Sequence, residues 1–234
     1  MTRLGTSVAR RAAKHLALAL VLTGAVAVML PVVVSADEPP KEWDGLARVK
    51  SKQLDHLYKL PEADFSGYKR VRLDPIEVEF DKNWKPNDSE RSSSRRLTSE
   101  DIEKIKKALA EEFRKVFTEE LTKSGYAVVE ENGDDVLRVT AAIVNLYITA
   151  PDKMSAGRSR TYTTSAGHAT LIAELRDSVT GKLMARAVDS VRGRDTGTFM
   201  ITNSVTNMSA ARTALSQWAR ILRDGLDDAT GRTK

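Results

Sequence analysis

Cysteine is absent from this chain of 234 residues, and histidine occurs only three times. The lack of cysteine excludes disulfide bonds, thiol catalysis and cysteine-ligated metal sites, so the stability of the fold must come from packing. It also excludes a lipid anchor, because a lipoprotein signal needs a cysteine where this chain has Ser35-Ala36-Asp37. His15, His56 and His168 form no HExxH or H-x-H pattern, so no metal site is expected.

Familiar catalytic motifs are missing as well. The string nearest to a Gly-x-Ser-x-Gly nucleophile motif, Gly157–Arg160, lacks the second glycine. The chain has neither a phosphate-binding loop nor a dinucleotide fingerprint. We therefore expect no catalytic residues, no cofactor and no enzymatic activity. The alternative is a secreted hydrolase of cell-envelope glycans that uses carboxylates. Its candidate residues are Asp134, Asp135, Glu174 and Asp189.

The first 36 residues have the layout of a bacterial secretory signal. Four basic residues precede an apolar run from Leu16 to Val34, and no acidic residue occurs before Asp37. The small residues of Val34-Ser35-Ala36 form a signal-peptidase site. We expect cleavage near Ala36 and a periplasmic or secreted protein. The apolar run is close to the roughly 20 residues that span a bilayer. An uncleaved inner-membrane anchor is therefore the alternative.

Removing this segment also removes the excess of positive charge. Four of the 37 basic residues lie in the first 36 positions, which leaves 33 basic against 32 acidic residues. A domain that binds nucleic acid usually has a basic surplus, so no nucleic-acid partner is expected. The rest of the chain is interpreted as a polar linker over residues 37–65, with one short helical turn at 51–58. A single domain over residues 66–230 follows.

Two segments have the periodicity of amphipathic helices. In residues 99–124 the apolar side chains recur at helical spacing, Thr98 and Asp101 are placed for a capping box, and Gly125 is placed to end the helix. The second helix is predicted over residues 206–228. Acidic side chains at its carboxyl end oppose the helix dipole, which predicts fraying after Leu226.

The strand patterns complete an α+β fold. Strands are predicted over residues 68–80, 126–130, 136–148, 169–176 and 183–191. The first is interrupted at Asp74-Pro75. The third is apolar on both faces and should therefore be central. Turn signals occur at Asn132-Gly133 and over Asp177–Gly181, and the second of these predicts a hairpin. We expect an antiparallel-rich sheet of about four to five strands with two amphipathic helices packed on one face.

Two loops rich in glycine, serine and threonine are the candidate binding feature. They cover residues 151–167 and 193–203 and adjoin the predicted hairpin. If both fall at the same end of the sheet, they would form a lip that binds an envelope protein or a glycan. The donors to such an acidic or glycan partner would be Arg158, Arg160, Tyr162, Arg192 and Arg194. The alternative is two mobile loops that bind nothing.

Several of these segments resemble a known family. They are the turn and strands of Leu175–Ala185 with Asp189, the strand Asp135–Val139, the helix face Trp218–Arg223 and the early strand Tyr68–Val78. Over about residues 60–228 the chain is similar to the bacterial envelope family called domain of unknown function 3313. The resemblance implies a lipoprotein-like envelope protein, although this chain lacks the lipid-accepting cysteine. It implies no activity and no catalytic residues, so the hypothesis is a non-enzymatic binding or structural module.

Overall fold

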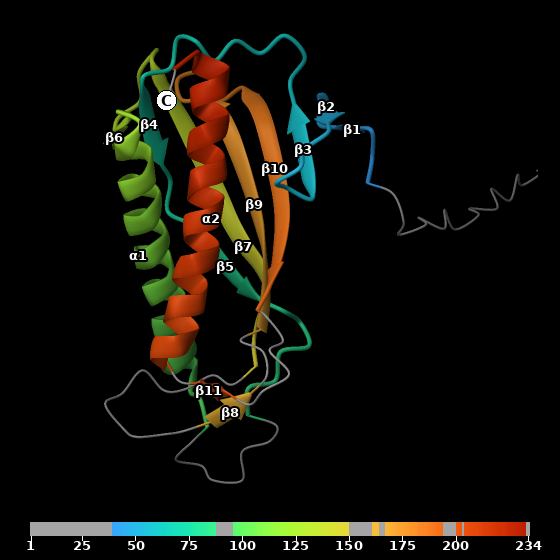
Figure 1. Cartoon of the computed structure of the whole chain (residues 1–234), viewed down its shortest axis with the longest axis vertical. Helices are drawn as coiled ribbons and strands as arrows, with labels where there is room; N and C mark the ends of the chain where they lie inside the picture. The colour runs from blue at the N-terminus through green and yellow to red at the C-terminus, as the bar shows by residue number, and fades with distance from the viewer. Residues whose placement is uncertain are drawn as a thin grey trace, which may run out of the picture. The chain divides into compact units, whose positions relative to one another are not determined.

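Two long helices lie together on one face of a large mixed β-sheet (Figure 1). The computed structural model describes residues 39–87, 96–149, 161–163, 167–193, 200–202 and 204–232. They fall within one unit, Pro39–Lys234. The predicted signal segment, residues 1–36, lies outside the described residues, so its cleavage stays a prediction.

The described strands are of two kinds, short and long. The short strands are β1 (Glu42–Trp43), β2 (Leu46–Val49), β3 (His56–Lys59), β4 (Arg70–Leu73), β5 (Glu77–Phe80), β6 (Ala127–Val129), β8 (Thr161–Thr163) and β11 (Met200–Thr202). The long strands are β7 (Val136–Ile148), β9 (Gly167–Asp177) and β10 (Leu183–Arg192). The helices are α1 (Ser99–Lys123) and α2 (Ser204–Thr230).

The sheet is larger and more mixed than the sequence predicted. Its nine described strands run in the order β1-β2-β3-β10-β9-β7-β4-β6, with β5 also paired to β7. The expectation of four to five antiparallel strands is therefore wrong, although the α+β class is right. Strands β4 and β5 both pair with β7 in parallel, one after the other along its edge. This geometry arises because α1 provides the crossover that parallel strands require.

The break at Asp74-Pro75 separates β4 from β5, as the sequence predicted. The prediction for β7 is correct in position, since this strand pairs with β9, β4 and β5 and lies inside the sheet. Apolar residues on both faces also predict that the strand is buried on both sides near its middle, and this is wrong. Leu137, Val139, Ala141 and Ile143 are buried, whereas the alternate positions after Val136 are partly buried or exposed. The helices cover one face of the sheet, and the other carries polar and charged side chains.

The described part of the predicted linker, residues 39–65, is not a linker. Strands β1, β2 and β3 extend the sheet by antiparallel pairing of β3 with β10, and residues 56–59 are strand where a helical turn was expected. Leu46 and Tyr58 are almost completely buried. The signal that could have revealed this hairpin is Asp44-Gly45, whose φ angles of 52° and 78° fit a two-residue turn.

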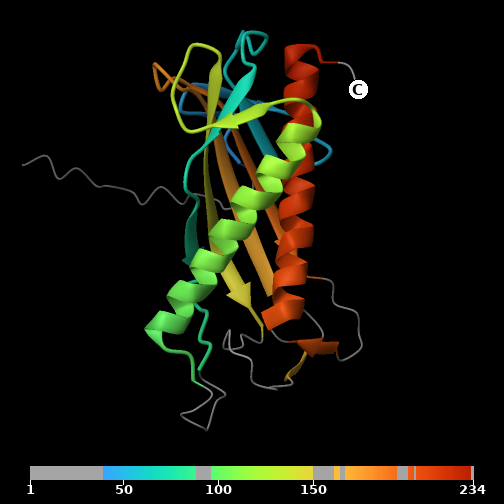
Figure 2. The ribbon, with the colours of Figure 1, turned by 90° about the vertical axis from the view of Figure 1, so that its left-hand side faces the viewer.

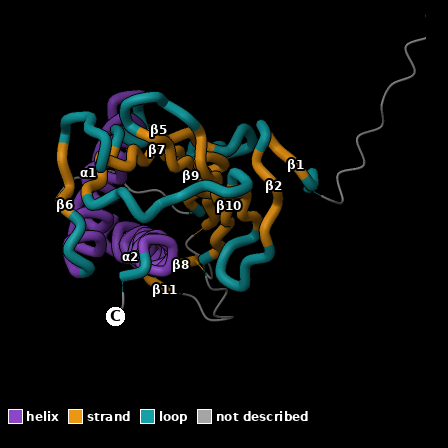
Figure 3. The backbone as a smooth tube through the Cα atoms, turned by 90° about the horizontal axis from the view of Figure 1, so that it is seen from above, coloured by secondary structure: helices purple, strands orange, loops and turns teal. Residues whose placement is uncertain are grey.

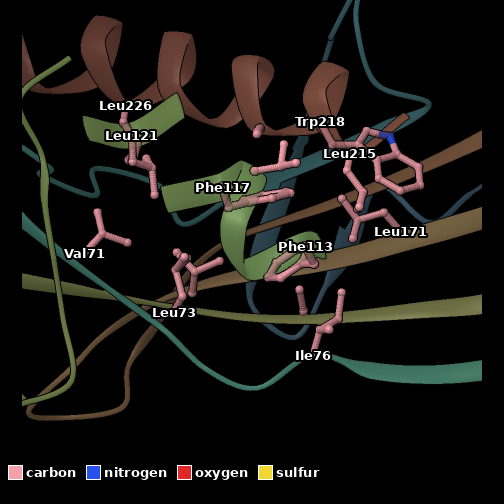
Figure 4. Packing of buried hydrophobic residues seen from close by; sticks show 14 of the residues in the cluster. Val71, Leu73, Ile76, Phe113, Phe117, Leu121, Leu171, Leu215, Trp218 and Leu226 are labelled. Carbon is pink, nitrogen blue, oxygen red and sulfur yellow. The ribbon is translucent and has the colours of Figure 1, made fainter. Parts of the chain in front are cut away.

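Helix α1 has the predicted capping box. Thr98 accepts a hydrogen bond from the Asp101 amide, the Asp101 side chain accepts one from the Thr98 amide, and Gly125 follows the helix with a φ of 76°. The face toward the sheet contains Phe113 and Phe117, whose rings stack at 4.0 Å. Figure 4 shows these rings between the strands and the buried side chains of α2.

Helix α2 continues to Thr230, so the predicted fraying after Leu226 is wrong. Asp227 is buried and accepts a hydrogen bond of 2.7 Å from the Ser124 hydroxyl at the end of α1. Arg232 donates to the Ser124 carbonyl at 2.7 Å and lies over the Tyr126 ring. These contacts tie the carboxyl ends of the helices together and offset the unfavourable helix dipole. Figure 2 and Figure 3 show the two helices adjacent to one another beside the sheet.

Candidate functional site

The two predicted loops meet at one end of the sheet. Strand β8 comes from the first loop and β11 from the second, and they pair with each other as a separate antiparallel ribbon. Figure 1 shows this ribbon beyond the end of β7, near the start of α2. The condition set by the sequence, that both loops fall at the same end, is met by their described residues.

The candidate binding residues are only partly placed. Arg158, Arg160 and Arg194 lie outside the described residues. Tyr162 is in β8, but its side chain is not described. Arg192 is the last residue of β10 and is exposed. The proposed contribution of these five residues to binding therefore stays a prediction.

An apolar cavity of about 440 Å³ lies at this same end, between α2 and the sheet. Its walls come from Ile105 and Leu109 of α1, from the last residues of β7, and from the first half of α2. The space exists because α2 presents alanines here. Their positions are Ala210, Ala211 and Ala214. The helical periodicity predicts Ala211 on the apolar stripe of this helix, but it does not indicate that space is left beside this residue.

A backbone irregularity shapes the rim of the cavity. The pairing of β7 with β9 shifts register between Val144 and Tyr147, and Asn145 adopts a φ of 52°. Gly167 has a φ of 124°, and a Cβ atom there would lie 1.8 Å from the Tyr147 carbonyl oxygen. β-Bulges of this kind bend a strand and redirect its side chains, often beside binding sites. The sequence signals were an asparagine inside a strand pattern and a glycine at the end of the first predicted loop, and neither was interpreted as a bulge.

Aromatic and polar side chains complete the rim. His168 stacks on Tyr147 with ring centroids 5.1 Å apart, and its Nε2 lies 3.8 Å from Asp81 Oδ2. His168 is the second residue of β9 and stands opposite Arg192 in the pairing of β9 with β10. Trp84 donates from Nε1 to the Ile148 carbonyl at 3.0 Å. These contacts hold the ends of β5, β7 and β9 together.

Asp189 links the cavity wall to the N-terminal strands. Its side chain is 6% exposed. It accepts hydrogen bonds from Trp218 Nε1 at 2.7 Å and from the Asp55 amide at 3.0 Å. The Asp55 carboxylate in turn accepts from the Ser190 amide at 2.9 Å. Asp189 therefore joins α2, β10 and the segment before β3, and it is engaged in structure.

The other carboxylates of the hydrolase alternative are held in ion pairs or exposed to solvent. Asp135 is bound by Arg70, which lowers the pKa of Asp135. Burial acts to raise the pKa of Glu174, but hydrogen bonds from Arg186 and Arg176 lower it overall. Glu174 lies on the opposite face of the sheet from Asp189, because side chains alternate along strands. Asp134 is exposed. A general acid needs a raised pKa, which neither Asp135 nor Glu174 has.

A pH-dependent contribution to stability follows for Glu174. We expect Glu174→Gln to lower the free energy of unfolding by about 2 kcal/mol at pH 7, because Arg186 is buried and loses one of its two anionic partners, with only the more exposed Asp44 remaining. A lowered pKa means that this stabilisation is present above about pH 4 and is lost as the pH falls below it. Urea unfolding at pH 7 and pH 3 should show a smaller difference at pH 3. Glu79→Gln, at an exposed position of β5, is the control. An equal difference at both pH values would contradict the role of this ion pair.

No cluster of three or more metal-ligating side chains is found among the described residues. Within the same residues, no helix is long and apolar enough to cross a bilayer.

Comparison with known proteins identifies the family. The sequence model described as "Protein of unknown function (DUF3313)" matches residues 37–222. No curated protein matches the sequence.

Solved structures provide remote likenesses. The PelC dodecamer from Paraburkholderia phytofirmans has 9% identity and a TM-score of 0.38, covering 71% of this chain and 96% of that one. A DUF330 protein from Xanthomonas campestris has 13% identity and a TM-score of 0.41, covering 75% and 94%. A minor lipoprotein from Acinetobacter baumannii has 10% identity and a TM-score of 0.30, covering 70% and 95%. The family match itself extends over most of the sequence, and the chain belongs to the DUF3313 family.

Proposed function

We propose that the chain is an exported envelope protein that acts as a non-enzymatic binding module, and that it takes the apolar part of its ligand into the cavity beside α2. The observation that carries this proposal is the cavity itself. Its volume of about 440 Å³ is within the range of small-molecule sites, roughly 300–1,000 Å³.

The size and lining of the cavity favour an apolar occupant. Protein interiors are close-packed, and spaces much larger than a water molecule are few in a domain. An aliphatic wall offers ordered water few hydrogen-bond partners. The aliphatic side chains that line this cavity include Ile143, Leu146 and Leu215. Covering these side chains with an apolar ligand would therefore stabilise the complex through burial of apolar surface.

The position of the cavity supports a role in binding. It opens at the end of the sheet where β8 and β11 bring the two Gly/Ser/Thr-rich loops together. The carboxylates that a hydrolase would need are engaged in structural contacts. Asp135 and Glu174 are held in ion pairs, and Asp189 accepts two structural hydrogen bonds. Export is supported by the signal-like layout of residues 1–36.

Filling the cavity should abolish binding of an apolar probe. We expect Ala211→Leu to weaken binding of the neutral dye N-phenyl-1-naphthylamine at least about tenfold, because the added carbons occupy space that the dye needs. The protein is recovered from the extracytoplasmic fraction of cells that express the full chain. Its N-terminus is determined by mass spectrometry, and dye binding is measured by fluorescence titration. Recovery there with Asp37 as the first residue would support export and cleavage.

The matched control is Ser209→Leu, which adds a larger apolar side chain at an exposed position of the same helix, away from the cavity lining. It should bind the dye as the wild type does. Thermal unfolding of both variants checks that each is folded. Absence of dye binding by the wild-type protein, or equal binding by Ala211→Leu, would overturn the role of the cavity. Turnover of an envelope glycan by the purified protein would overturn the non-enzymatic part.

A further inference from the structure

We infer that the cavity takes one extended, unbranched alkyl chain of about twelve carbons, which enters from the loop end and stops against Leu215 and Trp218. The ligand is a free amphiphile with a single chain, rather than a lipid with two chains. This inference rests on the proposed binding function and adds the chemical class of the ligand.

The cavity is long in the direction of α2. The residues of α2 that line it extend from Asn207 to Trp218, a length of about 16 Å. On the side of the sheet, β7 lines it from Ile143 to Ile148, which is also about 16 Å. Strand β7 ends and α2 begins at the end of the sheet where β8 and β11 lie (Figure 1). The mouth is therefore at Asn207 and Ile148, and the inner end is at Trp218.

The cavity is narrow across that direction. A volume of about 440 Å³ spread over a length of about 16 Å corresponds to a cross-section about 5 Å on a side. Carbon atoms in contact lie about 4 Å apart, so two hydrocarbon chains side by side need roughly twice the width of one. One chain fits this cross-section, and a pair of chains does not.

The inner end of the cavity is apolar and fixed. Leu215 and Trp218 are almost completely buried there. The Trp218 Nε1 group donates to Asp189 at 2.7 Å, which holds the indole in place and leaves it no donor for a ligand. A polar group at this wall would lose its hydration without gaining a partner. The methyl end of the chain therefore lies against the wall, and the head group stays at the mouth.

A series of alkylphosphocholines tests the length of the chain, because its members share one zwitterionic head group. The octyl, decyl, dodecyl, tetradecyl and hexadecyl compounds are titrated, each below its micelle concentration, against wild-type protein that carries N-phenyl-1-naphthylamine. We expect affinity to rise about fourfold per added methylene up to about twelve carbons and then to level off, because an extended chain of that size fills the cavity. A rise that continues unchanged to the hexadecyl compound would overturn the inference.

Diheptanoylphosphocholine tests the number of chains. It has the same head group as dodecylphosphocholine and at least as many tail carbons, but these are divided between two chains. We expect it to bind at least about tenfold more weakly than dodecylphosphocholine. Native mass spectrometry should detect one dodecylphosphocholine per protein. Equal affinities for the two lipids, or two bound chains per protein, would contradict a site for a single chain.

A substitution partway along the cavity tests the position of the chain. Ala214 lines the cavity about 10 Å beyond Asn207 along α2. Because Ala214→Leu shortens the space, we expect dodecylphosphocholine to bind about tenfold more weakly and the octyl compound to bind as it does to the wild type. The exposed control, Ser209→Leu, should leave the whole series unchanged.

The outcomes separate this inference from the proposed function. Equal weakening of all chain lengths by Ala214→Leu would show that the chain does not lie along α2. If this variant fails to unfold cooperatively on heating, the series on the wild type still decides the length and the number of chains. If the dye binds but affinity does not depend on chain length, the inference is overturned and the binding function stands. If the dye itself does not bind, the proposed function fails first.

Discussion

Replacing Gly167 with alanine is expected to lower the free energy of unfolding by about 3 kcal/mol or more. The φ angle of 124° at this residue is one that side chains with a Cβ rarely adopt. The added methyl group would lie 1.8 Å from the Tyr147 carbonyl oxygen and 2.9 Å from its carbonyl carbon. Because these atoms are backbone in a paired strand, they cannot rotate away. The bulge between β7 and β9 would have to separate.

Alanine substitutions at two other glycines provide the comparison for the loss of stability at Gly167. Gly181 has a φ of 71° but no atom near the position of an added Cβ, so Gly181→Ala should cost about 1 kcal/mol from backbone conformation alone. Gly67 has open space and no positive φ, so Gly67→Ala should change stability by less than about 0.5 kcal/mol. Urea unfolding of the three variants measures the series. A loss at Gly167 no larger than that at Gly181 would show that the close approach to Tyr147 does not exist.

Truncation of Asp189 is expected to destabilise the protein by about 3 kcal/mol, because Asp189→Ala leaves one buried and one partly buried donor without an acceptor. These donors are Trp218 Nε1 and the Asp55 amide, at 2.7 Å and 3.0 Å from the carboxylate. The loss of stability should be larger near β3 than in α1. The segment leading into β3 is held at this point, so amide exchange in β3 should accelerate more than exchange in α1.

Three further variants test whether the loss of stability comes from the hydrogen bonds of Asp189. Asp189→Asn retains one acceptor oxygen and should lose about half as much stability as Asp189→Ala. Asp228→Ala removes an exposed acid near the end of α2 and should change stability little. A double-mutant cycle with Trp218→Phe isolates the bond to the indole. Additive losses in that cycle would contradict a direct interaction between Asp189 and Trp218.

Much of the fold could be predicted because its signals are local. Thr98 and Asp101 lie three residues apart and mark the start of α1, and Gly125 follows its end. The Asp177 carboxylate accepts hydrogen bonds from Val179 and Thr180, and Gly181 has the positive φ that the turn needs. Each signal acts between residues that are close in the chain, so the residue types alone specify the conformation.

The candidate site was predictable only in outline. Composition placed two unusual loops next to the hairpin, and the pairing of β8 with β11 brings them together. The cavity beside them could not be predicted, because it depends on how far α2 stands from the sheet where Ala211 and Ala214 face it. The same alanines would be core residues in a helix that lay closer.

The other features that the sequence analysis did not predict depend on contacts between residues that are far apart in the chain. The N-terminal strands have few apolar positions of their own, and they are ordered because β10 provides an edge for β3. The acid at Asp227 is tolerated at a helix end because Ser124, more than a hundred residues earlier, donates to it. The sequence by itself determined the helices, the hairpin and the position of β7, since periodicity and turn chemistry act locally. The parallel pairing of β4 and β5, the joining of the helix ends and the cavity were decided by tertiary structure, because each depends on which distant surfaces come into contact.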